Sequence, residues 1–224
     1  MATFVFFHVG PDITMPTAMV ASIAAHNPGA EIIQVTDFDT PTVPKVTWAH
    51  PTRGDATRLM LWRTMAYAQL GLDIPALYMD TDMLVRKPIL PADLLGDADI
   101  AVCRRTFNRD GIFTPRQRGQ DYSEYTNRTL DSVYPYVGCA TITASYRQWD
   151  DMAALYQALP DKFKVWYGDQ EVLREYAQPP RKVVHLPESQ YGCLPENLPE
   201  FPHPAIVHYK GQRKALMFTA PTPA

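Results

Sequence analysis

Short apolar runs alternate with stretches of helical periodicity from the start of the chain. Residues 4–9 are apolar except for His8, as expected of a strand covered on both faces of a parallel sheet. A helix predicted between the turn at residues 10–12 and residues 27–29 places Met19, Val20 and Ile23 on one face. Residues 31–36 form a second predicted strand. This order of strand, helix and strand indicates one βαβ unit.

The same alternation continues to the C-terminal part of the chain. Asp55 fits the N-cap of a helix whose apolar face carries Leu59, Trp62 and Ala66. Further strands are predicted at residues 76–79, 98–103, 136–143, 183–186 and 205–209, and further helices at residues 148–159 and 169–176. This succession predicts an α/β fold in a single domain, with a mixed, mostly parallel sheet flanked by helices.

Two stretches break the alternation. Residues 104–128 hold six arginines against three acidic residues and show little periodicity, which predicts a long basic loop. Residues 179–204 hold seven of the 21 prolines, which predicts an extended segment wrapped over the domain. The tryptophans Trp48, Trp149 and Trp166 are interpreted as core or pocket lining.

Composition narrows the class of protein. With 224 residues and 46% hydrophobic residues, the chain can bury one core without disulfides. The net charge of −3 argues against a surface that binds nucleic acid throughout. We expect a cytoplasmic protein with at most peripheral membrane contact. The reasons are three dispersed cysteines, no basic leader before Lys45 and no apolar run long enough to span a bilayer.

Two carboxylates interrupt an apolar run where the predicted strand 76–79 ends. Asp80 and Asp82 are one residue apart, so period-two geometry aims both at the same side. Divalent cations such as Mg²⁺ and Mn²⁺ bind carboxylate oxygens and complete their shell with phosphates. Turn chemistry at a strand end is the alternative interpretation. The pair therefore favours a metal-bound diphosphate at the carboxyl end of a strand, where open α/β sheets bind ligands.

Five sequence elements occur together in a fixed order. They are Gly54-Asp-Ala-Thr-Arg58, Tyr78-Met-Asp-Thr-Asp82, Tyr136-Val-Gly-Cys139, Gly168-Asp-Gln-Glu171 and His208-Tyr-Lys-Gly-Gln-Arg-Lys214. The set resembles the D-x-D-containing glycosyltransferases of the GT-A (Rossmann-like) fold, in particular the glycogenin and lipopolysaccharide galactosyltransferase family and the related mannosyl- and galactosyltransferases. The resemblance implies one catalytic domain over residues 1–224, with a nucleotide-binding half at 1–103 and an acceptor-side half at 104–214.

The resemblance also implies a set of metal ligands. Asp80 would contact the metal and the ribose, Asp82 would chelate the metal, and His208 would supply a third ligand. Two carboxylates and an imidazole suit Mn²⁺ (or Mg²⁺) better than Ca²⁺. Gly211 would let the backbone approach the diphosphate, and Lys214 would pair with it as the leaving group gains charge. A hydrogen-bonded strand histidine is the alternative role of His208.

Other positions receive roles from the same resemblance. Catalytic roles fall to Asp169, Gln170, Lys214 and Arg58, and nucleotide-sugar contacts to His8, Asp12, Asp55, Arg58, Asp80, Thr81, Gly138, Gly211 and Lys214. Several have structural alternatives: an exposed ion pair for Arg58, a helix N-cap for Asp169 and a β-turn for Asp12.

The implied activity is transfer of a sugar from a nucleoside diphosphate sugar, with a UDP-sugar favoured, to an acceptor hydroxyl with retention of anomeric configuration. The basic stretch 104–128 favours a glycan or a polyanionic acceptor, nucleic acid such as modified DNA included, against the alternative of a solvated loop. Two other functions fit parts of the sequence. These are a haloacid dehalogenase-type phosphohydrolase, which also has a D-x-D strand, and a non-catalytic nucleotide-sugar-binding protein.

Overall fold

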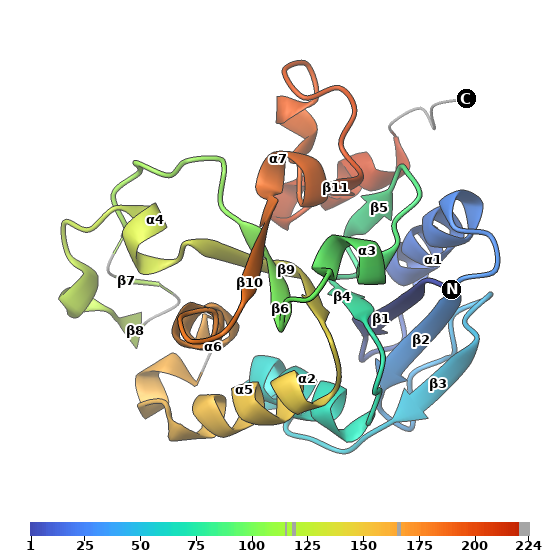
Figure 1. The fold of residues 1–224 in the computed structure, drawn as a ribbon, viewed down its shortest axis with the longest axis horizontal. Helices are drawn as coiled ribbons and strands as arrows, with labels where there is room; N and C mark the ends of the chain where they lie inside the picture. Colours follow the sequence, from blue (N-terminus) through green and yellow to red (C-terminus); the bar gives the residue numbers. More distant parts are fainter. Residues whose placement is uncertain (115, 118–119, 165–166, 220–224) are drawn as a thin grey trace.

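The computed structural model describes residues 1–114, 116–117, 120–164 and 167–219, and is built on a seven-stranded sheet (Figure 1). In spatial order the strands are β10 (Val183–Pro187), β6 (Ile100–Arg104), β9 (Tyr136–Thr143), β4 (Ala76–Met79), β1 (Thr3–Phe7), β2 (Glu31–Thr36) and β3 (Trp48–Pro51). Only β9 runs against its neighbours β4 and β6 within this sheet of described residues. The predicted mixed, mostly parallel sheet is therefore confirmed.

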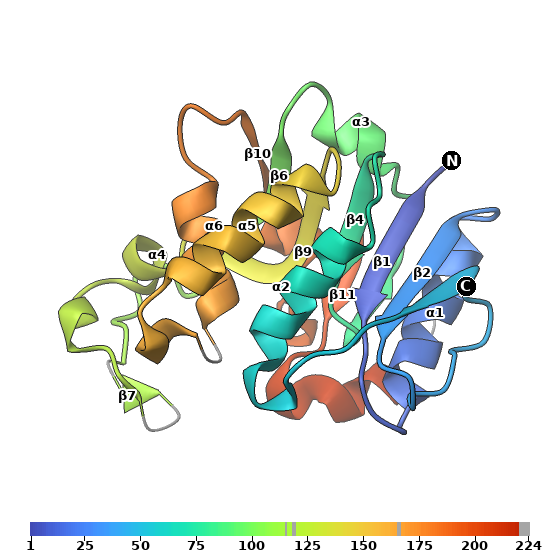
Figure 2. The same cartoon turned by 90° about the horizontal axis from the view of Figure 1, so that it is seen from below.

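Helices cover both faces of the sheet (Figure 2). Helices α2 (Leu59–Gln69), α5 (Arg147–Ala158) and α6 (Gly168–Tyr176) pack together on one face, and α1 (Thr14–His26) lies on the other. Strand β1 shows why both faces must be covered. Phe4 and Phe6 join the core cluster of α1, whereas Val5 between them joins the cluster of α2, as the two-residue period of a strand dictates.

A two-stranded ladder lies beside the main sheet. Strand β5 (Met83–Val85) follows β4 after a short turn and pairs antiparallel with β11 (Ile206–His208), in the register His208↔Met83. Helix α1 packs against β5. The ladder therefore brings the C-terminal part of the chain next to the turn that contains Asp80 and Asp82.

The remaining elements are short. They are α3 (Pro91–Leu95), α4 (Leu130–Val133), α7 (Glu188–Tyr191), the hairpin strands β7 (Arg116–Gln117) and β8 (Gln120–Asp121), and the 3-10 helices η1 (Ala56–Arg58), η2 (Ser123–Tyr125), η3 (Asp161–Phe163), η4 (Pro195–Asn197) and η5 (Gly211–Phe218). No helix in the described part of the chain has both the length and the apolar character needed to cross a bilayer.

Two sequence expectations need correction. The stretch 104–128 is more than a loop, because it contains β7, β8 and η2 and contributes to an aromatic cluster of its own: Phe113, Tyr122, Tyr125, Val133, Tyr134 and Phe163. The stretch 179–204 is extended only in part, because α7 and η4 are helical, and its strand β10 belongs to the main sheet. Trp149 is buried as expected, Trp48 is half-buried, and Trp166 lies outside the described residues.

Candidate functional site

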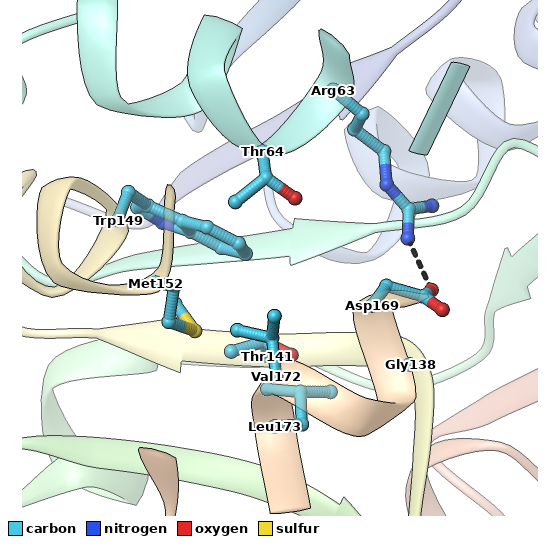
Figure 3. A pocket seen from close by; sticks show the side chains of 9 residues that line it. All are labelled: Arg63, Thr64, Gly138, Thr141, Trp149, Met152, Asp169, Val172 and Leu173. Carbon is cyan, nitrogen blue, oxygen red and sulfur yellow. Dashed lines mark hydrogen bonds and ion pairs between the residues drawn. The ribbon is translucent and has the colours of Figure 1, made fainter. Parts of the chain in front are cut away.

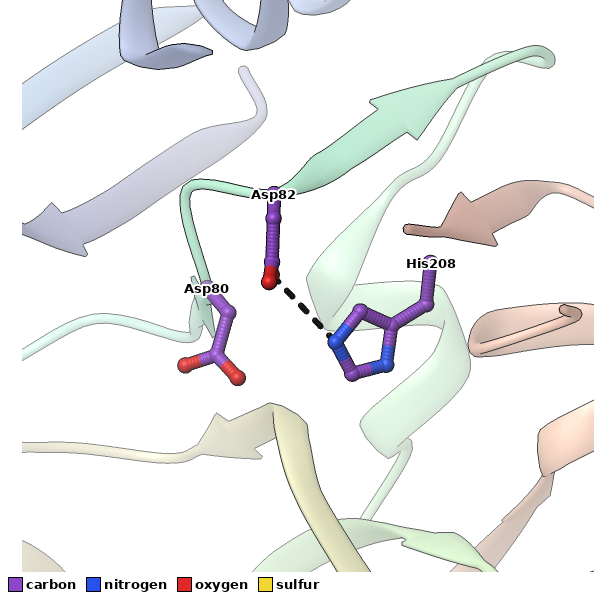
Figure 4. A group of neighbouring side chains, drawn as sticks. All are labelled: Asp80, Asp82 and His208. Atoms are coloured by element: carbon purple, nitrogen blue, oxygen red, sulfur yellow. Dashed lines mark ion pairs between the residues drawn. The ribbon is translucent and has the colours of Figure 1, made fainter. Parts of the chain in front are cut away.

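Asp80, Asp82 and His208 converge on one point at the carboxyl end of β4 (Figure 4). Each offers one ligand atom, and the three atoms lie within 4.8 Å of one another. The two aspartates lie in the turn between β4 and β5, and His208 ends β11. Two carboxylates and an imidazole at this spacing fit a divalent cation such as Mn²⁺ or Mg²⁺.

The β5–β11 ladder explains the position of His208. The backbone N–H of Tyr209 donates to the Asp82 carbonyl at 2.8 Å, so the two segments remain paired beyond the strand. His208 Nε2 then lies 3.3 Å from Asp82 Oδ1, and Lys214 Nζ lies 3.3 Å from Asp82 Oδ2. His208 is buried, whereas Lys214 is exposed on η5. Asp82 thus contacts a buried partner, His208, and a solvent-exposed partner, Lys214.

Arg63 of α2 links the turn to a second acidic residue. Its Nη1 lies 2.7 Å from Asp80 Oδ1, and its Nη2 lies 2.7 Å from Asp169 Oδ2 at the start of α6 (Figure 3). Gly138 of β9 lies directly beneath Asp169, because a Cβ at this position would be 2.8 Å from Asp169 Oδ2. The missing side chain therefore leaves room for the Asp169 carboxylate.

The two aspartates of the turn have opposite pKa shifts. Burial and the charge of Asp82 raise the pKa of Asp80 to about 6, against the lowering effect of Arg63. Burial also disfavours the charge on Asp82, but the hydrogen bond from His208 and the charge of Lys214 outweigh it and lower its pKa to about 2. Burial opposes the charge on His208, whereas Cys139 and Asp82 favour it, and its pKa rises to about 10. A proton on His208 thus balances Asp82 when no cation is bound.

A small cavity of about 20 Å³, room for about one water molecule, adjoins the Arg63–Asp169 pair between α2, α5, β9 and α6 (Figure 3). Arg63, Gly138 and Asp169 line it at one end, and Trp149, Val172 and Leu173 contribute apolar surface. Ligand pockets combine a mainly apolar lining with a few fixed polar groups. Arg63 and Gly138 also line a second small cavity, which Asp80 borders.

The other predicted positions are distributed over several elements. Gln170 follows Asp169 on α6, Thr81 lies between the two aspartates, and Gly211 opens η5 with a φ of 66° that favours glycine. Asp55 caps η1 through the N–H of Thr57, and Arg58 is exposed and makes no ion pair within 4.0 Å in the described part of the chain.

His8 and Asp12 lie just after β1. Asp12 Oδ1 accepts a hydrogen bond from the N–H of Thr14 at the start of α1, which is the turn role given above as the alternative. Burial lowers the pKa of His8, so its ring is neutral near pH 7. Contact of these two residues with a nucleotide base stays a prediction.

Sequence reasoning missed Arg63 and Arg105. Arg63 is a lone charged residue in the apolar run of α2, and that isolation is the feature that could have pointed to it. Arg105 follows β6 and reaches Gln170 Oε1 with Nη2 at 3.5 Å. Neither partner could be read from local sequence, because both arginines act across elements distant in the chain.

No protein-family model and no curated protein sequence matches the chain. Solved structures do match. The bifunctional glycosyltransferase WbbM gives a TM-score of 0.59 at 14% identity over 94% of this chain and 46% of its own. GlyE of Streptococcus pneumoniae TIGR4 gives 0.61 at 16% identity over 94% of this chain and 55% of its own. The chain thus spans about half the length of these two proteins.

A third match covers nearly the whole of both chains. A glycosyltransferase involved in glycosylation of the major capsid of PBCV-1 gives a TM-score of 0.60 at 14% identity over 96% of this chain and 98% of its own. Similarity at this level of identity is similarity of fold, and it confirms the fold that the sequence elements predicted. The chain has the GT-A fold of these glycosyltransferases.

Proposed function

We propose that the chain is a metal-dependent glycosyltransferase that moves a sugar from a nucleoside diphosphate sugar, with a UDP-sugar favoured, to an acceptor hydroxyl. The convergence of Asp80, Asp82 and His208 at the carboxyl end of β4 carries the proposal. Ligands bind at this end of the strands in open α/β sheets, and the donor set suits Mn²⁺ or Mg²⁺. The GT-A fold supports the same conclusion.

The charges around the site suit departure of a diphosphate. In the reaction the bond between the anomeric carbon and the diphosphate oxygen breaks, and the acceptor oxygen forms the new bond as its proton leaves. A bound cation held by Asp80, Asp82 and His208 would offset the charge that develops on the diphosphate. Lys214, exposed and 3.3 Å from Asp82, would bind the same group from the solvent side.

The sugar would lie toward Arg63, Asp169 and Gln170. Arg63 and Asp169 line the small cavity described above, Gln170 follows Asp169 on α6, and the hydrogen-bonding groups of all three suit sugar hydroxyls. Retention of anomeric configuration, implied by the sequence resemblance, belongs to this proposal, as do glycan and polyanionic acceptors.

Thermal unfolding with UDP-, GDP- and ADP-sugars, each with and without Mn²⁺, tests donor and metal together. A ligand at one hundred times its Kd stabilises by about 2.7 kcal/mol. We expect stabilisation by a UDP-sugar only when Mn²⁺ is present, together with Mn²⁺-dependent release of UDP.

The variant Asp82→Asn keeps the size of the side chain and removes its charge. We expect UDP release to fall more than about 100-fold, since even groups that only support a metal ligand are worth 10–100-fold. Asp97→Asn is the matched control, because Asp97 is exposed and pairs only with Lys182 among the described residues. Retained turnover in Asp82→Asn, or hydrolysis of p-nitrophenyl phosphate in place of nucleotide sugars, would contradict the proposal.

A further inference from the structure

Arg105 is a buried arginine at the edge of the candidate site. It follows the last residue of β6 and is 9% exposed. Its backbone N–H donates to the Pro135 carbonyl at 2.8 Å, and its Nε donates to the Tyr134 carbonyl at 2.8 Å. Backbone and side chain are therefore both held against the segment that leads into β9, and the guanidinium has a fixed position.

This guanidinium forms no close ion pair with a described residue. No carboxylate of the described residues lies within 4.0 Å of it, although buried charges are ordinarily paired. The nearest acids lie farther away, and the charge of Glu188 is the one that most favours the protonated guanidinium. Asp131 pairs with Arg104 and Arg109, and Glu188 accepts from two backbone N–H groups and lies 3.6 Å from Lys210 Nζ.

The unpaired charge lies next to the residues proposed to hold the sugar. Arg105 Nη2 is 3.5 Å from Gln170 Oε1, a long contact that leaves the donor group free for a better acceptor. Gln170 adjoins Asp169, which shares the charge of Arg63 with Asp80. Arg105 therefore places a second positive charge next to Gln170.

We infer that Arg105 binds an oxyanion of the sugar substrate, either a carboxylate or a phosphate. This inference rests on the proposed function. A planar guanidinium with one edge anchored on a carbonyl can present its remaining N–H groups to two oxygens at once. The substrate class is thus an anionic sugar: a uronic acid unit of the donor, or a uronate or sugar phosphate in the acceptor.

Matched substrates separate these two sources. UDP-glucose and UDP-glucuronate are compared as donors with Mn²⁺, and methyl glucoside, methyl glucuronide and glucose 6-phosphate as acceptors. With the wild-type protein we expect the charged member of one set to have a KM at least tenfold below that of its neutral counterpart. In Arg105→Gln we expect this ratio to fall to within twofold.

A purely structural role would lower stability without changing the ratio between charged and neutral substrates. Arg105→Lys keeps the charge and is expected to retain part of the preference for the charged substrate. It replaces Arg105→Gln in the comparison if that variant does not fold. Arg181→Gln is the control, because Arg181 pairs with Asp151 outside the site. A wild-type enzyme that turns over UDP-sugars but ignores substrate charge, or an unchanged ratio in Arg105→Gln, overturns this inference alone. A protein that neither binds nor turns over any nucleotide sugar overturns the proposed function as well.

Discussion

Arg63 and Asp169 lie 2.7 Å apart although 106 positions separate them in the chain. The same guanidinium also reaches Asp80, so one side chain of α2 joins the turn after β4 to the start of α6. Both side chains are partly buried, with 30% exposed for Asp80 and 16% for Asp169, and they share the charge of Arg63. Arg63 therefore holds the turn after β4 against the start of α6 and offsets the repulsion between the two carboxylates.

Removal of the Arg63 charge should destabilise the protein. We expect Arg63→Met to lower the free energy of unfolding by about 3 kcal/mol, because it leaves two carboxylates without their cation. The double variant Arg63→Met/Asp169→Asn should lose less than the sum of the single changes. Urea unfolding of the two single variants and the double variant measures this coupling. Additive losses would show that the two groups do not interact.

Gly138→Ala should impair activity more than stability. The added Cβ would lie 2.8 Å from Asp169 Oδ2, so the carboxylate must move away from Arg63. Misplacement of a positioned group by about 1 Å can cost about 100-fold in rate. We expect a fall in kcat of this order for UDP-sugar turnover and a smaller change in urea unfolding than for Arg63→Met. Wild-type kcat in Gly138→Ala would mean that Asp169 does not need this position.

Binding of Mn²⁺ should release a proton. The pKa of His208 is raised to about 10, so the imidazole is protonated at pH 7.5, and a metal ligand must be neutral. Below about pH 6 a second proton should leave Asp80, whose pKa is also raised to about 6, and the apparent affinity should fall further. Isothermal titration at pH 7.5 in HEPES and in Tris gives the number of protons from the difference in binding enthalpy. Equal enthalpies in both buffers would contradict the expectation.

The aromatic cluster beside the stretch 104–128 should contribute strongly to stability. Phe113 is 4% exposed and its ring contacts Tyr122, Tyr125 and Tyr134. We expect Phe113→Ala to cost about 3 kcal/mol in the free energy of unfolding, as for other buried aromatic residues. The adjacent Ile112 is 63% exposed, so Ile112→Ala should change stability by less than about 0.5 kcal/mol. Similar losses for both variants would contradict a packed cluster.

Elements with a strong local pattern were predictable from the sequence. The strands 31–36, 76–79 and 136–143 have the predicted ends, because their apolar runs are bounded by polar residues or turns. Strand β3 was missed because it contains Pro51 among other nearby prolines, and a proline is tolerated there only because β3 is an edge strand. Helix α3 has five residues, too few for a helical period to appear.

The residues of the candidate site likewise differ in whether local sequence could predict them. Asp80 and Asp82 were found from their one-residue spacing at the end of a predicted strand, and His208 from a short sequence element. Arg63 depends on partners 17 and 106 positions away, and such contacts exist only once the sheet and helices are assembled. The aromatic cluster was hidden for a similar reason, since Phe163 joins it from a distant part of the chain.

The ladder of β5 and β11 makes the site depend on the register of the two strands. Only three residue pairs hold His208 opposite Met83. A slip by a single position would turn the imidazole to the other face of the strand and present Val207 or Tyr209 in its place. Insertions in the turns before β11 would therefore leave this register unchanged. One residue added inside β11 would instead move the histidine away from its carboxylates and leave the main sheet intact.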